Sequence, residues 1–292
     1  MIKLDKILVP VDFSGRNLAA VRDAGNLARH FHSEVTLLHV NELVVLHPMT
    51  GPLGFGVSSA NAAQAGNLSR QKQELDAFGV AELTGVEVKR LICSGDPAKL
   101  IVEHAHTGGV DLILMPTRGK GAFRRLLLGS VAAKVLHDAE CPVWTGRHVG
   151  DAPAPGPTEV RHVMCAINFG PQSAKALRWA ADFAAEFRAK LTVVHAVLGT
   201  PPNLPDRYMF QWHGEAVGGA DERLRAFLIA SNVQADVLIV DGETPKVIGT
   251  AVGQHGAGLL VMGRSCVSGR NGRLGSEAYG IICHAPCPVV SI

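Results

Sequence analysis

The sequence predicts an α/β protein built from two repeated, doubly wound domains. Residues 6–40 match residues 162–196 at a constant offset of 156. A second pair follows, residues 111–144 with residues 258–290, at an offset of 147 for Met115 and Met262 and of 146 for Gly129 and Gly275. Within each half, short runs of Val, Ile and Leu alternate with amphipathic segments, which is typical of a parallel sheet covered by helices on both faces. We therefore expect a five-stranded parallel sheet in each half.

The elements of the first half follow from the positions of its apolar residues. ILVPV at residues 7–11 is a short, β-rich apolar run and predicts a buried strand. The next segment predicts an amphipathic helix that ends near Phe31, because its apolar residues recur at helical spacing: Leu18, Val21, Ala24, Gly25 and Ala28. EVTLLHV at residues 34–40 predicts the second strand. The remaining strands are VEVKRLI, DLILMP and CPVW, with a helix opened by Gly95-Asp96-Pro97 between the first two of these.

The repeat also sets the domain boundaries. We expect a first domain at residues 1–147 and a second at residues 161–292, joined by residues 148–160. Three prolines in the joining segment exclude helix and ladder pairing, so this segment predicts a short, semi-rigid linker. Gly- and Pro-rich loops follow the second strand of each half, at residues 47–59 and 199–212, and such loops often carry function.

The two domains are expected to pack as a pseudo-two-fold pair that imitates a homodimer. Each sheet ends in a short strand, CPVW at residues 141–144 and CPVVSI at residues 287–292. Pairing these two edges would hide backbone groups that otherwise invite aggregation. Duplication makes the two surfaces similar and therefore available to each other. The sequence does not decide whether the whole chain also forms a homodimer.

Composition and charge narrow the class of protein. Of the 292 residues, 47% are hydrophobic and 18% are charged, which is typical of a compact soluble protein. The net charge is +2, with 16 basic and 14 acidic residues up to position 147 and 12 of each after it, so nucleic acid is not the expected partner. No apolar run reaches the roughly 18 residues that a membrane span needs, and the N-terminus lacks an apolar signal segment. We therefore expect a cytoplasmic protein without a membrane partner, in which six cysteines do not form a disulfide framework.

Ligands of open parallel sheets bind beyond the carboxyl ends of the strands, where the strand order reverses. The first-half residues expected there come from the ends of the first and second strands and from the segment after the fourth: Pro10, Val11, Asp12, Val40, Thr117, Arg118, Gly119, Gly129, Ser130 and Val131. The glycines let a backbone approach a phosphate closely, and a helix that starts near Ser130 offers free N–H groups to an anion. Asp12 supplies an acceptor for a ribose hydroxyl or a base amino group. Five basic and no acidic residues lie between positions 112 and 137, which favours attraction of phosphate.

These residues resemble the universal stress protein family over nearly the whole chain, twice. Nucleotide-binding members carry the signature G-x2-G-x9-G-[S/T] after the fourth strand and an Asp after the first. Asp12, Gly119, Gly129 and Ser130 stand in the matching places, whereas Pro116 replaces the first glycine and has no N–H to donate. The resemblance implies a stress-response regulatory or chaperone-like protein that binds ATP or another adenine nucleotide, with Mg²⁺ as an optional companion ion.

The second half departs further from this signature. Asn168 stands in place of the Asp, Ala166 in place of the preceding Pro, and Cys266 in place of the second glycine. The first glycine is present as Gly263, but its spacing to Gly275 is one residue short. We therefore predict a nucleotide site in the first half and a degenerate site in the second.

Other chemistries find little support in the sequence. No G-x-S-x-G nucleophile motif and no G-x4-G-K-[ST] phosphate loop is present, so a dedicated hydrolase or kinase is not indicated and no catalytic residue is assigned. The 13 histidines show no metal-ligand spacing, and His39 and His195 occupy equivalent strand positions, which favours a role in the fold or at an interface. Two alternatives stay open. One is a nucleotide-free scaffold whose loops bind an unidentified protein, and the other is a weak ATP-hydrolysing enzyme.

Overall fold

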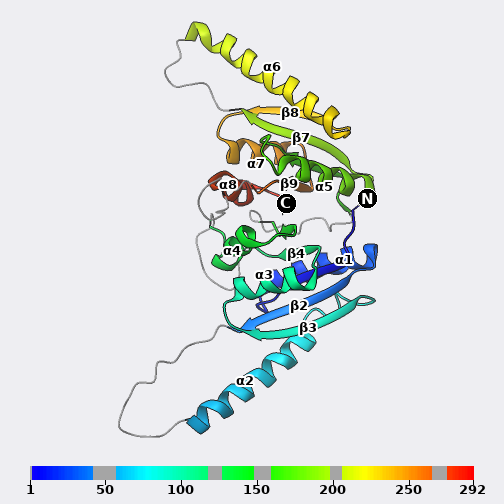
Figure 1. Ribbon diagram of the computed structural model, residues 1–292, viewed down its shortest axis with the longest axis vertical. Helices are drawn as coiled ribbons and strands as arrows, with labels where there is room; N and C mark the ends of the chain where they lie inside the picture. The colour runs from blue at the N-terminus through cyan, green and yellow to red at the C-terminus, as the bar shows by residue number, and fades with distance from the viewer. Residues whose placement is uncertain (1, 42–56, 118–126, 148–158, 198–205, 265–274) are drawn as a thin grey trace, which may run out of the picture.

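A single ten-stranded sheet runs through both halves of the chain in the computed structural model (Figure 1). The structure describes residues 2–41, 57–117, 127–147, 159–197, 206–264 and 275–292, and in residues 57–66 and 206–213 it describes the backbone alone. From edge to edge the strand order is β3-β2-β1-β4-β5-β10-β9-β6-β7-β8. The first half contributes β1 (Lys6–Pro10), β2 (Glu34–Asn41), β3 (Glu87–Ser94), β4 (Leu112–Met115) and β5 (Val143–Thr145). The second half contributes β6 (His162–Ala166), β7 (Lys190–Val197), β8 (Asp236–Asp241), β9 (Leu259–Met262) and β10 (Val289–Ser291).

Helices cover both faces of this sheet. Those of the first half are α1 (Gly15–Phe31), α2 (Val57–Ala77), α3 (Pro97–Gly108) and α4 (Ser130–Asp138). Those of the second half are α5 (Ser173–Glu186), α6 (Asp206–Ser231), α7 (Thr244–Gln254) and α8 (Ser276–His284). The core on one face takes its helical side chains from α1, α2, α5 and α6, and the core on the other face takes them from α3, α4, α7 and α8. Neighbouring strand residues such as Leu8 and Val9 enter opposite cores, which explains why the strands read as continuous apolar runs.

The two halves join through their last strands, as predicted. All pairs within each half are parallel, whereas β5 and β10 pair antiparallel, with Trp144 opposite Val290. Trp144 and Val290 occupy equivalent positions of the repeat, at its offset of 146. An element that pairs with its own equivalent is the signature of a two-fold arrangement. The structure thus confirms the pseudo-two-fold pair of five-stranded parallel sheets.

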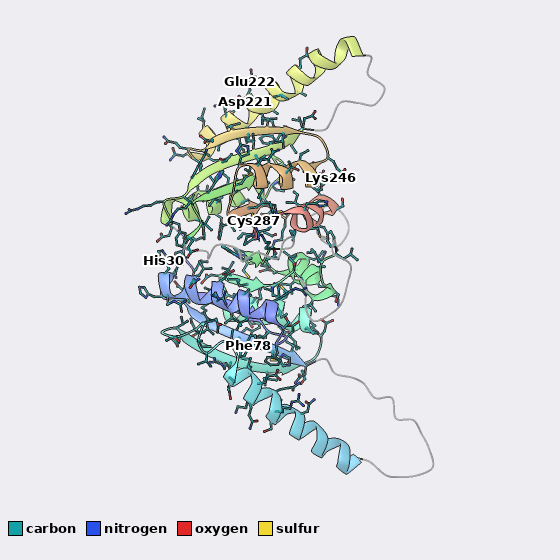
Figure 2. The ribbon with its side chains drawn as sticks, turned by 180° about the vertical axis from the view of Figure 1, so that it is seen from behind. His30, Phe78, Asp221, Glu222, Lys246 and Cys287 are labelled. Atoms are coloured by element: carbon teal, nitrogen blue, oxygen red, sulfur yellow. The ribbon has the colours of Figure 1, made fainter. Side chains whose placement is uncertain are left out.

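A second contact between equivalent positions lies at the ends of α1 and α5. His30 Nε2 lies 2.8 Å from Glu186 Oε1, and the rings of Phe31 and Phe187 meet edge to face with centroids 5.9 Å apart. Both pairs are related by the repeat offset of 156. His30 lies where the two halves meet (Figure 2). The pseudo-two-fold axis therefore passes between these helix ends as well as between β5 and β10.

The two segments predicted as loops after β2 and β7 are helical in their last part. The backbone of α2 begins at Val57 and that of α6 begins at Asp206, whereas residues 47–59 and 199–212 were expected to be loop throughout. All the Gly and Pro residues of both segments precede these helix starts, so nothing after them breaks a helix. The two helices lie beside the edge strands β3 and β8, at opposite ends of the long axis (Figure 1).

Asp23 on α1 makes folding stability depend on pH. Burial of its carboxyl group raises its pKa from 3.8 to about 7, although nearby Arg22 opposes the shift. Because the folded state holds this proton more tightly than the unfolded chain, its contribution is fully present below about pH 4 and is lost as the pH rises to about 7. Asp23→Asn cannot ionise, so urea unfolding at pH 8 should show a gain in stability of about 1–3 kcal/mol. The variant should match the parent near pH 4.

The exposed Asp76 on α2 provides a control for this prediction. Asp76→Asn should leave the pH profile of the free energy of unfolding unchanged. If Asp23→Asn also leaves that profile unchanged, burial of Asp23 does not control the pH dependence.

Candidate functional site

The candidate site lies where the strand order of the first half reverses. β1 has β2 on one side and β4 on the other, so the chain leaves β1 and β4 at neighbouring points of one sheet edge. Val11 and Asp12 follow β1, Thr117 follows β4 by two residues, and Val40 is the penultimate residue of β2. Open parallel sheets bind their ligands in the crevice that such a reversal creates. The topology therefore brings together the three segments expected from the sequence.

Asp12 is held in place by Asn17 in the first turn of α1. The backbone N–H of Asp12 donates to Asn17 Oδ1 at 2.7 Å, and Asn17 Nδ2 donates to the carbonyl oxygen of Pro10 at 3.1 Å. One oxygen of the Asp12 carboxylate accepts the N–H of Ser14 at 2.9 Å. Asn17 is 2% exposed, so these bonds lie in the interior and fix the half-buried Asp12. Sequence reasoning missed Asn17, although a buried Asn in an otherwise apolar helix face was the available signal.

Asp12 and the end of β1 form one wall of the candidate crevice, and the start of α4 forms the other wall. Gly129 precedes the helix with φ −62° and ψ 148°, and its N–H donates to the carbonyl oxygen of buried Thr117 at 2.8 Å. The first N–H groups of a helix have no partner within the helix, and its dipole favours an anion at this end. Ser130 is exposed and Val131 half-buried in this first turn. The arrangement can bind a phosphate through backbone N–H groups.

The second half supports this wall from the side. The N–H of Leu128, directly before Gly129, donates to the hydroxyl oxygen of Tyr279 on α8 at 2.8 Å. At the other end of α4, the guanidinium of Arg264 donates to the carbonyl oxygens of Ala139 and Cys141 at 2.7 and 2.8 Å. A cation at the carboxyl end of a helix is stabilised by the helix dipole. α4 is therefore fixed at both ends by residues of the other half, which sequence reasoning did not anticipate.

Part of the predicted site lies outside the described residues. Gly119 belongs to this part, as do four of the five basic residues expected to attract phosphate, including Arg118. Of the five, the described Lys134 pairs with Asp96 at 3.2 Å. The described candidates are Pro10, Val11, Asp12, Val40, Thr117, Gly129, Ser130 and Val131, and they come from the three segments that meet at the sheet edge.

The equivalent edge of the second half is built differently. Asn168 Oδ1 accepts the N–H of Gly170 at 2.9 Å and the hydroxyl of buried Ser173 at 3.0 Å, so its oxygen is engaged locally. A Cβ on Gly263 would lie 2.9 Å from Gln172 Cβ, so the loop after β6 packs directly on the chain after β9. This glycine is required by close packing at the mouth of the crevice. The remaining signature position, Cys266, lies outside the described residues.

Three titratable side chains of the described segments, His39, His195 and Cys287, have contacts or burial that fit structural roles. His39 and His195 each place Nδ1 at 2.7 Å from a backbone carbonyl oxygen, that of Val11 and that of Ile167, at equivalent positions. Burial raises the pKa of Cys287 to about 12, so this thiol stays protonated and is a poor nucleophile.

No group of three or more His, Cys, Asp or Glu that could hold a metal ion occurs in the described part of the chain. Within the same residues, no helix is both long and apolar enough to span a membrane.

Comparison with known proteins places the chain in a family. The model of the universal stress protein family matches residues 3–147 and, a second time, residues 159–292. The chain belongs to the universal stress protein family. Universal stress protein MJ0531 of Methanocaldococcus jannaschii is 34% identical over 138 residues, which is 47% of this chain and 79% of that protein. Universal stress protein YxiE of Bacillus subtilis is 31% identical over 145 residues, 48% of this chain and 96% of that protein.

The full-length arrangement also occurs in a solved universal stress protein. The match to the crystal structure of a universal stress protein from Archaeoglobus fulgidus covers 99% of this chain and 96% of that protein's chain, with a TM-score of 0.69. At 21% sequence identity this likeness shows the fold. The tandem universal stress protein fold therefore spans both halves of the chain.

Proposed function

We propose that the first half binds ATP or a related adenine nucleotide in the crevice between the ends of β1 and β4. The observation that carries this proposal is that Asp12, fixed by Asn17, and the start of α4 follow the neighbouring strands β1 and β4 at the strand-order reversal. Asp12 would accept a hydrogen bond from the ribose or the base, and the N–H groups after Gly129 would hold the phosphates. Val40 and the backbone of Pro10 and Val11 would line the nucleoside side. Any Mg²⁺ would enter bound to the phosphates of the nucleotide and would not need a separate site on the protein.

Each of the two halves would then have a different role. In the second half, Asn168 is bonded locally and Gln172 packs against Gly263, which supports a degenerate site there. The pseudo-two-fold contact supports the remaining site, because Tyr279 and Arg264 hold α4. We therefore propose residues 1–147 as the nucleotide-binding domain and residues 161–292 as its structural partner, joined by a linker at 148–160.

The proposed activity is regulatory or chaperone-like, in the cytoplasm, under stress. We propose that any ATP hydrolysis is slow and secondary. The bound nucleotide would act as a signal that is read by a protein partner. A nucleotide-free scaffold is the alternative, favoured by the missing N–H of Pro116.

Mass spectrometry of small molecules released from freshly purified, denatured protein tests this function. We expect an adenine nucleotide in the parent protein and none in a Gly129→Val variant. Absence of nucleotide in the parent, together with no binding at millimolar ATP, would leave the scaffold as the better account.

Replacing Pro116 with Gly tests the one departure of the first half from the family signature. The variant gains an N–H at the anion side, and a hydrogen bond to a charged group is worth at best about 1.5–3 kcal/mol before the added backbone freedom of Gly is subtracted. We expect nucleotide affinity to stay equal or to rise by up to about tenfold in a calorimetric titration. A clear loss of affinity would show that Pro116 itself shapes the pocket.

A further inference from the structure

A pocket of about 440 Å³ opens in the second half, next to the carboxyl ends of β6 and β7 and against α6. Its lining includes Phe169, His195, Val197, Ala220 and Arg223. The nucleotide site proposed above belongs to the first half, so this pocket is separate from it. All its lining residues lie in the described part of the chain.

The first half fills the equivalent space with a chain of polar side chains. His39 Nε2 lies 3.0 Å from Asn41 Oδ1, and Asn41 Nδ2 donates to Gln71 Oε1 at 2.7 Å, which ties β2 to α2. Val197 replaces Asn41 at the offset of 156. Ala220 replaces Gln71 at the offset of 149 that also relates the fully buried Leu75 and Leu224. The second half has therefore lost this polar bridge, and apolar side chains line the space instead.

Loss of the bridge leaves a hydrogen-bond acceptor at the pocket. His195 Nδ1 lies 2.7 Å from the carbonyl oxygen of Ile167, and because a carbonyl only accepts, Nδ1 carries the proton. In the neutral imidazole Nε2 is then an acceptor, and no side chain of the described residues bonds to it. A ligand N–H or O–H group in the pocket would satisfy this nitrogen.

The mouth of the pocket carries a cation over an aromatic ring. The guanidinium carbon of Arg223 lies 4.2 Å from the centroid of the Phe169 ring. At the offset of 149 the first half has Glu74, so the charge at this position is reversed. Asp221 and Glu222 both lie on α6 (Figure 2). Asp221 is paired with Arg225 at 2.6 Å, and Glu222 is adjacent to Arg223 in sequence, so the two side chains do not face each other on the helix. Arg223 is thus available to an anionic ligand.

Small residues of α6 line the pocket at Ala216, Gly219 and Ala220. A Cβ on Gly219 would meet nothing within 4 Å, so packing does not require glycine here. Gly214 and Gly218 of the same helix are equally open. The first half has Arg70 at the position equivalent to Gly219. Gly219 therefore keeps open a space that a longer side chain would occupy.

We propose that the second half has a ligand site of its own, for a small aromatic carboxylate that carries a hydrogen-bond donor. The ring of the ligand would lie against Phe169 and the apolar wall of Val197 and Ala220. Its N–H or O–H would donate to His195 Nε2, and its carboxylate would pair with Arg223 at the mouth. The half with a degenerate nucleotide crevice would thereby bind a second, chemically different ligand.

Calorimetric titration of the full chain with 4-hydroxyphenylacetate tests this site, and the uncharged 4-hydroxyphenylacetamide is the matched ligand. We expect the acid to bind with Kd below about 1 mM and the amide about tenfold more weakly, because the amide lacks the charge that pairs with Arg223. Arg223→Glu introduces the residue type found at the equivalent first-half position. It should lower the affinity for the acid by at least about tenfold and leave the affinity for the amide unchanged. Ala220→Gln should remove binding of both.

Adenine nucleotide binding in the first half serves as the internal reference. Both variants should bind ATP as the parent does, so failure of the nucleotide proposal would be visible separately from failure of this one. Equal affinity for the acid and the amide, no binding of the acid at 10 mM, which lies about tenfold above the expected Kd, or an unchanged Arg223→Glu titration would each overturn the proposed site.

Discussion

Replacing Gly129 with Val is expected to abolish nucleotide binding while leaving the fold intact. Gly129 has φ −62° and ψ 148°, an extended conformation that valine adopts without strain. The backbone N–H that bonds to Thr117 also remains. The added side chain would occupy the space where phosphate approaches the start of α4, so affinity should fall by at least about 100-fold in a calorimetric titration.

The second half supplies a matched control for this variant. Gly275 precedes α8 with φ −58° and ψ 147°, which reproduces the geometry of Gly129. Gly275→Val should leave nucleotide affinity unchanged, because we propose that this half binds no nucleotide. Equal loss of binding in the two variants would mean that the two halves do not differ as proposed.

Truncating Trp144 to Ala is expected to have the largest effect on stability. Trp144 is 1% exposed on β5, pairs with Val290 on the pseudo-two-fold axis, and its ring lies 5.8 Å from that of Phe183 on α5. A cavity would open at the joint between the halves, and large-to-small changes of buried aromatic residues cost about 3–5 kcal/mol. Urea unfolding followed by circular dichroism would measure the loss.

Trp144→Phe separates ring packing from the indole N–H. The indole nitrogen is buried and has no hydrogen-bond partner among the described residues, so its removal relieves an unsatisfied donor. We expect Phe to cost about 1 kcal/mol or less, because the lost volume and the relieved donor act in opposite directions. A cost for Ala below about 1 kcal/mol would show that Trp144 does not hold the halves together.

The repeat made the pairing of β5 with β10 predictable. Two parallel sheets that each end in a short apolar strand leave an edge that must be covered, and a duplicated edge can cover itself. The same logic applied to His39 and His195, whose equivalent strand positions correctly indicated a role in the fold. Local pattern and chain symmetry were sufficient for these features.

Features that depend on side chains meeting across the chain were not predictable. Asn17 positions Asp12 through two backbone groups, and Tyr279 reaches Leu128 from the other half over a separation of 151 residues. No spacing rule links such pairs, since their contact follows from packing alone. The pocket beside α6 was missed for a related reason, because Val197 and Ala220 are unremarkable until β7 and α6 are brought together.

A calorimetric titration of the full chain with ATP tests the central claim most directly. One nucleotide per chain, lost in Gly129→Val and kept in Gly275→Val, is the result that a single site in the first half predicts. Two equal sites per chain, or no binding at millimolar ATP, would contradict it.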